Sequence, residues 1–120
     1  MIFHPEDAPL ESQPERSLVL RRLINRESHS GNLSLTWVSI EGHHDRIVNH
    51  ESDRVYYVIE GTGRFQIGDD AAVESAGPGD CVLIPKGTPY EFEGDMRYLV
   101  INGPAFRSGA DTVLPSRFDA

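Results

Sequence analysis

Short apolar stretches alternate with turn residues along most of the chain. Residues 33–40 (LSLTWVSI) alternate as a half-buried strand does, residues 17–24 (SLVLRRLI) are a second strand candidate, and residues 25–32 have loop composition. Further strands are expected at residues 46–50, 54–60, 64–68, 73–77, 80–85, 90–94 and 96–103, with turns at 61–63 and 69–72. No convincing amphipathic helix interrupts this pattern, which therefore predicts an all-β sandwich or barrel.

Irregular segments flank the predicted strands at both ends. Residues 1–17 carry three prolines among acidic residues, which favours an arm lying along the domain rather than a helix or central strand. Residues 103–120 are interpreted as a second arm, packed on the domain through Phe106, Val113, Leu114 and Phe118. The 120 residues are the length of one compact domain, so a single domain spanning residues 1–120 is predicted.

The amino-acid composition limits the binding partners and the cellular location that can be expected. With 11 Lys plus Arg against 19 Asp plus Glu, the formal charge of -8 argues against nucleic acid and anionic membranes as partners. No segment approaches the ~20 apolar residues of a membrane span, and the N-terminus has no secretory pattern, so no membrane association or export is expected. Cys81 lies in an apolar run and is expected to be a small buried side chain. A cytoplasmic location is the resulting expectation.

Two glycine-anchored blocks have a fixed spacing. The first block is Gly42, five residues, Val48, one residue, His50, three residues, Arg54, six residues and Gly61. The second block is Gly79, five residues, Pro85, one residue, Gly87, two residues, Tyr90, three residues and Gly94. These blocks resemble the two sequence motifs of the cupin family. The resemblance implies a jelly-roll β-barrel over about residues 33–101, with the two arms outside it, and a homodimer.

The departures from the family pattern fall on the metal ligands. A typical metallocupin uses three histidines and a glutamate, and the matching positions here are Val48, His50, Arg54 and Tyr90. Valine cannot bind a metal, and the protonated guanidinium of Arg54 would repel a divalent cation. A metal cofactor is therefore possible but not favoured; if one is bound, His50 and Tyr90 are the ligands expected from this set.

Other histidines do not complete the ligand set. His44 lies six residues from His50, roughly 20 Å along an extended strand, so the two cannot share an ion unless the chain bends sharply. The cluster at residues 41–46, with His43, His44 and Asp45, is interpreted as a solvated bend because adjacent side chains on an extended segment point to opposite faces.

Strand parity predicts which side chains face the barrel interior. Arg54, Tyr56 and Val58 should share the inward face, and Tyr90 should face inward with Phe92 while Glu91 and Glu93 point away. A buried guanidinium requires an anion, either a bound carboxylate or phosphate or an internal Asp or Glu. His50, placed inward by its motif position, and Tyr90 could act as an acid–base pair, or could be a satisfied core histidine and an aromatic plug.

Several functions follow from this predicted pocket. The leading hypothesis is a protein that binds a small polar, anionic molecule through Arg54, Tyr56, His50 and Tyr90, with or without turnover. A metal-free sugar or keto-acid isomerase or epimerase using His50 and Tyr90 is the first alternative, in line with what some cupins resembling this arrangement do. A metal-dependent oxygenase or isomerase with a non-standard ligand set is the second. The residues alone leave these hypotheses open.

Overall fold

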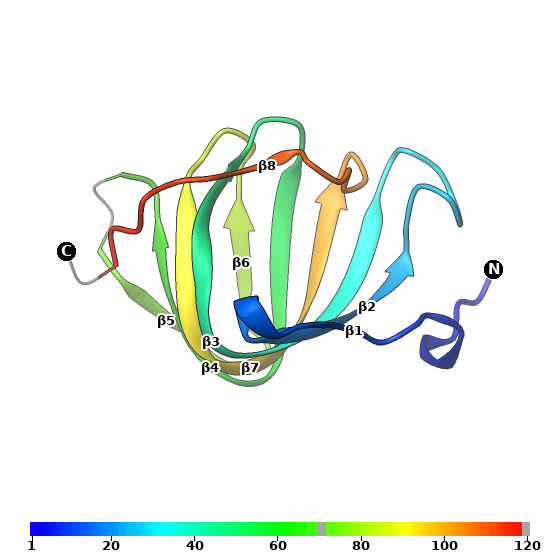
Figure 1. Ribbon diagram of the computed structural model, residues 1–120, viewed down its shortest axis with the longest axis horizontal. Helices are drawn as coiled ribbons and strands as arrows, with labels where there is room; N and C mark the ends of the chain where they lie inside the picture. Colours follow the sequence, from blue (N-terminus) through cyan, green and yellow to red (C-terminus); the bar gives the residue numbers. More distant parts are fainter. Residues whose placement is uncertain (70–71, 119–120) are drawn as a thin grey trace.

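A computed structural model gives the architecture of the protein and describes residues 1–69 and 72–118 (Figure 1). The described residues form strands and two short 3-10 helices, η1 (Pro5–Asp7) and η2 (Pro14–Arg16). The strands are β1 (Glu11–Gln13), β2 (Leu18–Ile24), β3 (Ser34–Asn49), β4 (Asp53–Ile67), β5 (Glu74–Ala76), β6 (Cys81–Ile84), β7 (Tyr90–Gly103) and β8 (Asp111–Val113). The all-β prediction is confirmed. The turn expected at residues 69–72 falls partly outside the described residues.

One antiparallel sheet curls around the interior of the molecule (Figure 1). The strand order is β1-β2-β3-β7-β4-β5, with β6 also paired to β4 and β8 to β3. The long strands β3, β4 and β7 pair over nearly their whole lengths, with β7 in the middle. The pattern of the sequence predicts each of them as two short strands, and the turn predicted at residues 61–63 is wrong because β4 runs through it.

Glycines let the long strands bend where they cross from one side of the barrel to the other. Gly94 on β7 lies opposite Gly42 on β3 and Gly63 on β4, so three glycines form a row across the sheet. A Cβ on Gly94 would come within 2.4 Å of the Thr62 carbonyl oxygen. Gly61 has a φ of 79°, and a Cβ there would lie 2.1 Å from the Asp95 carbonyl oxygen. Glycine at a barrel corner permits this close approach of two backbones.

Aromatic and aliphatic side chains fill the interior. Tyr56, Phe65, Tyr90, Phe92 and Tyr98 form a connected cluster of stacked and edge-to-face rings. Around them lie the other core residues, chiefly Leu18, Leu20, Val38, Ile40, Ile47, Val58, Val82, Ile84 and Met96. Cys81 is exposed, so the expectation of a buried thiol is wrong: it pairs with Tyr57, whose side chain lies on the outer face of β4.

The two flanking segments are more regular than the sequence indicates. In the N-terminal segment, β1 pairs with β2, and Arg21 donates to the carbonyl oxygens of Pro5 and Ala8 at 3.1 and 2.6 Å. In the C-terminal segment, β8 pairs with β3. Phe118 packs as expected, edge-on to the His43 ring, whereas Val113 is 58% exposed and does not pack on the domain. Among the described residues, no helix has the length and apolar character needed to cross a membrane.

Candidate functional site

A small cavity of about 110 Å³ lies inside the barrel. Polar residues of β1, η2, β2, β3, β4, β7 and β8 line it, and they include Gln13, Arg16, His44, Arg54, Tyr56, Tyr98, Asn102 and Asp111. Apolar side chains of β2 and β3, among them Leu20 and Val38, form another part of the wall. A wider cavity of about 490 Å³ shares Arg22, Ser34, Thr36 and Phe106 with the inner one, so the two adjoin. An apolar pocket with a few convergent polar groups is typical of a small-molecule site.

Arg54 is buried, as strand parity predicts, and the protein itself satisfies it. Its Nε donates to Asn102 Oδ1 at 2.9 Å, one terminal nitrogen donates to the Tyr90 hydroxyl at 2.7 Å, and the other pairs with Asp111 Oδ1 at 3.2 Å. Asn49 also donates to Asp111, at 2.9 Å. The sequence analysis allows either a bound anion or an internal Asp or Glu as the partner of Arg54, and the structure shows an internal carboxylate, that of Asp111. Arg54 therefore does not require an anionic ligand.

The hydroxyls of Tyr90 and Tyr56 form a hydrogen-bonded chain with Arg54. The Tyr90 oxygen accepts from Arg54 and lies 2.5 Å from the Tyr56 oxygen, a contact in which either hydroxyl can donate. When Tyr90 is the donor, the Tyr56 proton is free to face the cavity that Tyr56 lines. Burial raises the pKa of Tyr56 and, further still, that of Tyr90, and the opposing effect of Arg54 does not cancel this. Both tyrosines keep their protons at neutral pH, and Arg54 polarises the chain they form.

His44 lines the cavity, so the interpretation of residues 41–46 as a solvated bend is wrong. Its ring stacks on Phe92 with centroids 4.5 Å apart and on Tyr90 at 6.0 Å. Burial, assisted by the charge of Arg54, lowers the pKa of His44 to about 4. The ring is therefore neutral at pH 7. Nδ1 lies 2.7 Å from the Asp45 carbonyl oxygen and must be the donor there, which leaves the Nε2 lone pair as an acceptor.

His50 does not face the barrel interior. It is exposed in the connection between β3 and β4. Between His44 and Ile47, β3 holds one more residue than the facing stretch of β7, from Phe92 to Tyr90. This bulge reverses side-chain parity, so His44 faces inward before it and Ile47 after it, while His50 falls on the opposite face. The acid–base pair expected from His50 and Tyr90 is not formed; His44 takes the place beside Tyr90.

The four family ligand positions do not fit a metal cation. His50 is exposed, the buried Val48 side chain has no atom that can bind a metal, and Arg54 brings a positive charge into the interior. Tyr90 is engaged with Arg54 and Tyr56. Within residues 1–69 and 72–118, no three His, Cys, Asp or Glu side chains lie close enough to hold an ion together.

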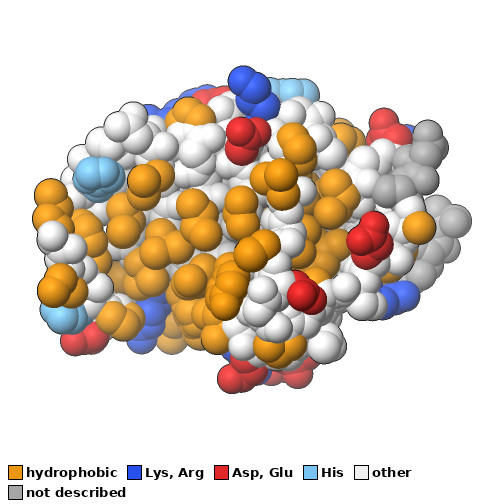
Figure 2. Space-filling view, turned by 180° about the vertical axis from the view of Figure 1, so that it is seen from behind, with side chains coloured by type: hydrophobic (Ala, Val, Ile, Leu, Met, Phe, Trp, Pro, Cys, Tyr) orange, Lys and Arg blue, Asp and Glu red, His pale blue; other side chains and the backbone are white. Residues whose placement is uncertain are grey.

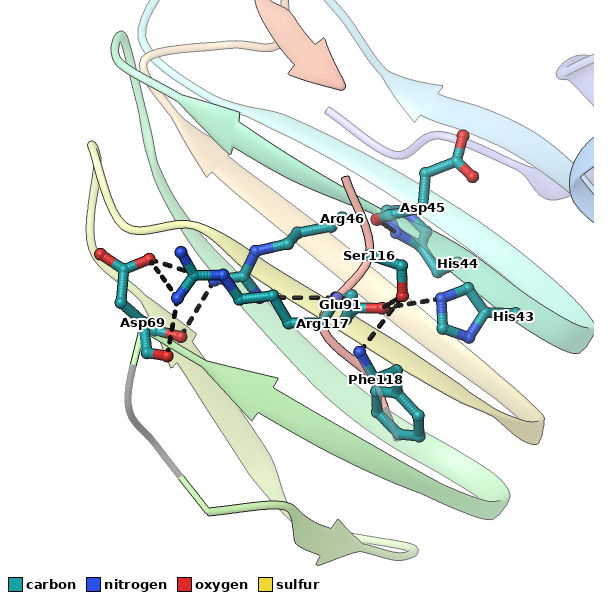
Figure 3. A network of polar contacts seen from close by, with 10 residues as sticks. His43, His44, Asp45, Arg46, Asp69, Glu91, Ser116, Arg117 and Phe118 are labelled. Carbon is teal, nitrogen blue, oxygen red and sulfur yellow. Dashed lines mark hydrogen bonds and ion pairs between the residues drawn. The ribbon is translucent and has the colours of Figure 1, made fainter. Parts of the chain in front are cut away.

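The wall behind the site carries a second polar network, centred on Glu91 (Figure 3). Glu91 points away from the interior, as predicted, but it is fully buried because the C-terminal segment covers it. Its carboxylate accepts from His43 Nε2 at 2.9 Å, Ser116 Oγ at 2.5 Å and the Arg117 amide at 2.7 Å. Burial alone would raise the pKa of Glu91, but these bonds outweigh it and lower the pKa. Glu91 thus anchors the segment that brings Asp111 to Arg54.

Comparison with known proteins agrees with this barrel. A family model described as "Cupin domain" matches residues 35–102, whereas no curated protein matches the chain significantly. Among solved structures, the nucleoside dehydratase PAC13 of Streptomyces is 21% identical, with 95% of this chain and 90% of that chain covered and a TM-score of 0.81.

Two further solved structures are similar over most of this chain. The polyketide cyclase RemF from Streptomyces resistomycificus is 26% identical, with 98% and 87% of the two chains covered and a TM-score of 0.77. Oxalate decarboxylase from Bacillus subtilis is 20% identical, with 93% of this chain but only 32% of that longer chain covered and a TM-score of 0.78.

Proposed function

The chain belongs to the cupin family, and we propose that it is a small-molecule enzyme whose barrel pocket transfers protons without a metal. The observation that carries this proposal is the pairing of a neutral histidine acceptor with a neutral tyrosine donor in the lining of one cavity. His44 and Tyr56 have environments that move their pKa values in opposite directions, His44 downward and Tyr56 upward. Such a pair supplies a base and an acid at the same pH.

The likeness to the Streptomyces nucleoside dehydratase supports this choice of residues. PAC13 has been solved with uridine in variants that replace one histidine by glutamine or either of two tyrosines by phenylalanine. The two tyrosines are 34 positions apart there, as Tyr56 and Tyr90 are here. The histidine precedes the first tyrosine by 13 positions there, which is the spacing of His43 here, whereas His44 precedes Tyr56 by 12. Of these two neighbours, His44 is the one that lines the cavity. We infer that His44, Tyr56 and Tyr90 occupy equivalent places.

The proposed reaction is the elimination of water from a hydroxylated carbonyl compound of nucleoside or sugar size. His44 Nε2 removes a proton from the carbon next to the carbonyl, and Tyr56 donates a hydrogen bond to the carbonyl oxygen as it gains charge. The electron pair of the broken C–H bond forms a carbon–carbon double bond as the neighbouring hydroxyl leaves. That hydroxyl takes the proton from His44, so water departs and the histidine returns to its neutral form.

The other functions considered from sequence gain or lose support from the same geometry. An isomerase or epimerase would use the same groups but return the proton to carbon, so the site supports it with His44 in the role first given to His50. A strictly anionic ligand loses its main support because Asp111 already balances Arg54. An oxygenase that depends on the four family ligand positions does not fit the residues at those positions.

A turnover assay tests the proposal. The protein is incubated in D2O with nucleosides, sugars and their aldehyde or ketone forms, and NMR and mass spectrometry follow carbon-bound deuterium and loss of water. We expect loss of water from at least one carbonyl compound, reduced at least 100-fold in His44→Gln and about 10-fold or more in Tyr56→Phe. His50→Gln is the matched control and should keep full activity. Exchange without loss of water would indicate an isomerase; equal activity of His44→Gln and wild type would refute the assignment.

A further inference from the structure

The row of side chains that contains Tyr56 continues across the barrel wall to Arg22. Cross-strand pairing places Arg22 opposite Thr36, Thr36 opposite Val100, and Val100 opposite Tyr56. All four side chains line the inner cavity. Three strand spacings of about 4.8 Å separate Arg22 from Tyr56, so their backbones lie roughly 14 Å apart along the sheet. A molecule whose carbonyl oxygen meets Tyr56 can therefore reach Arg22 with its other end.

The inner cavity alone is too small for a substrate of the proposed class. Its volume of about 110 Å³ is below the roughly 300–1,000 Å³ of ordinary ligand pockets, whereas the adjoining outer cavity holds about 490 Å³. A substrate whose reacting carbons lie between His44 and Tyr56 must therefore extend into the outer cavity. Four residues line both cavities and mark the passage between them: Arg22, Ser34, Thr36 and Phe106.

Arginines gather around the outer cavity. Its lining includes Arg22, Arg26 and Arg107. The Nε of Arg22 donates to Glu11 at 3.2 Å, but the two terminal nitrogens of Arg22 donate to no group in the part of the chain that the structure describes. Arg26 donates one terminal nitrogen to the Ala105 carbonyl oxygen at 3.1 Å and pairs with no carboxylate among the described residues. Arg22 and Arg26 therefore keep N–H donors for a ligand.

Nearby carboxylates balance these arginines only in part. Glu51 holds Arg107 through both of its oxygens, at 3.1 and 2.5 Å. Glu11 touches Arg22 at the outer edge of the site, where the two side chains are 42% and 34% exposed, and exposed ion pairs of this kind contribute little. Glu27 is the other acidic residue of the lining. An anion that enters the outer cavity can therefore compete for the free side of Arg22.

Two neighbours of Arg22 complete the passage. The Arg22 guanidinium lies 5.4 Å from the centre of the Phe106 ring, a cation–π contact that holds it between the two cavities. The Phe106 amide donates to Ser34 Oγ at 2.8 Å. Ser34 is buried, and its own hydroxyl proton has no acceptor among the described residues. Ser34 can therefore donate to a hydroxyl group of a ligand that lies in the passage.

The remaining surface is a poor competitor for an anion. On the face shown in Figure 2, hydrophobic side chains gather across the middle, and Lys and Arg side chains lie toward the edges. With 11 Lys plus Arg against 19 Asp plus Glu, the chain as a whole repels anions. A gathering of arginines beside the inner cavity stands out against this charge.

We propose that Arg22 and Arg26 bind an oxyanion, a phosphate or a carboxylate, at the end of the substrate remote from its carbonyl group. This inference rests on the proposed function and narrows its substrate class to phosphorylated or acidic sugars and compounds of similar size. A guanidinium donates two parallel hydrogen bonds to an oxyanion, which the terminal nitrogens of Arg22 are free to do. The hydroxylated carbons between the two ends lie in the passage, beside Ser34 and Thr36.

Isothermal titration calorimetry on the full chain tests the proposal with matched probes. The pairs are ribose 5-phosphate against ribose and glucuronate against glucose. At low salt, at least one anionic probe should bind at least tenfold more tightly than its neutral partner, and the preference should shrink as ionic strength rises. A preference in the first pair alone identifies phosphate as the oxyanion, and a preference in the second alone identifies carboxylate. Equal affinities within both pairs would overturn the proposal.

Substitutions separate the site from the overall charge. Arg22→Gln and Arg26→Gln should each weaken the anionic probe at least fivefold and leave the neutral probe unchanged. Arg97→Gln removes the same charge at a residue that pairs with Asp95 and lines neither cavity, so it should bind as wild type does. Glu11→Gln removes the competing carboxylate and should tighten the anionic probe. Equal weakening by Arg22→Gln and Arg97→Gln would show that net charge alone attracts the anion and would contradict the assignment.

The titration needs no turnover, so it can fail or succeed independently of the proposed reaction. An anion preference that Arg22→Gln abolishes, in a protein that removes water from no carbonyl compound, would support the binding site and refute the reaction. Loss of water from a carbonyl compound, in a protein without any anion preference, would leave the reaction standing and overturn the site.

Discussion

Lowering the pH from 7 to 4 should destabilise the fold, and His44 should account for a separable part of the loss. In the unfolded chain its pKa is the ordinary 6.5, whereas burial lowers it to about 4 in the folded protein. Between these values the unfolded state binds a proton that the folded state does not. The contribution of neutral His44 to the free energy of unfolding is complete above pH 6.5. It declines as the pH falls below 6.5 and is lost below about pH 4. At about 1.4 kcal/mol per pKa unit, the difference amounts to about 3 kcal/mol.

Urea denaturation of wild type and His44→Gln at pH 7, 6, 5 and 4 measures this contribution. Carboxylates such as Glu91 titrate in both proteins, so only the difference between the two pH slopes reports on His44. We expect wild type to lose about 3 kcal/mol more than the variant over this range. His29→Gln, which changes an exposed loop histidine, should keep the wild-type slope. Parallel slopes for wild type and His44→Gln would refute the burial of a neutral His44.

Three further substitutions test other parts of the structure. Asp111→Asn leaves Arg54 without its carboxylate and should lower the free energy of unfolding by about 2 kcal/mol, with tighter binding of formate; unchanged urea stability would argue against the ion pair. Glu91→Gln should loosen the C-terminal segment and raise its proteolytic cleavage rate at least tenfold, an effect that mass spectrometry locates; equal cleavage rates would remove Glu91 as the anchor. Gly61→Ala should lower the unfolding temperature by more than about 10 °C, because its Cβ meets the β7 backbone and its φ is positive; a variant as stable as wild type would contradict the close approach of β4 to β7.

The sequence predicts the interior of β4 and β7 correctly because both strands are regular there. Arg54, Tyr56 and Val58 are all buried, and so are Tyr90 and Phe92. Alternation with a period of two is reliable wherever no residue is inserted. The long strands are predicted as shorter pieces because glycine indicates a turn in most sequences. Here the row of Gly42, Gly94 and Gly63 bends three strands without ending them.

The sequence analysis assigns His50 to the pocket, whereas the structure places His44 there. The alternation of side chains along a strand cannot reveal the cause of this error. One additional residue between His44 and Ile47 exchanges the two faces of β3. The residues at that bulge are Asp45 and Arg46, and neither residue type marks a bulge in the sequence. Sequence reasoning also misses Asp111, because it approaches Arg54 from 57 positions away, on a segment interpreted as an arm. The one available indication is the buried guanidinium itself, which requires an anion somewhere in the fold.

The proposed chemistry depends above all on a neutral His44 that meets the bound molecule through its Nε2 atom. Long-range proton–nitrogen NMR of the imidazole nitrogens, recorded at pH 7 with and without uridine or the best substrate from the turnover assay, tests this contact directly. The structure predicts a protonated Nδ1, an unprotonated Nε2, and an Nε2 resonance that shifts on binding, whereas the resonances of exposed His50 stay fixed. A protonated His44 ring at pH 7, or an Nε2 resonance that no bound ligand moves, would contradict this role for His44.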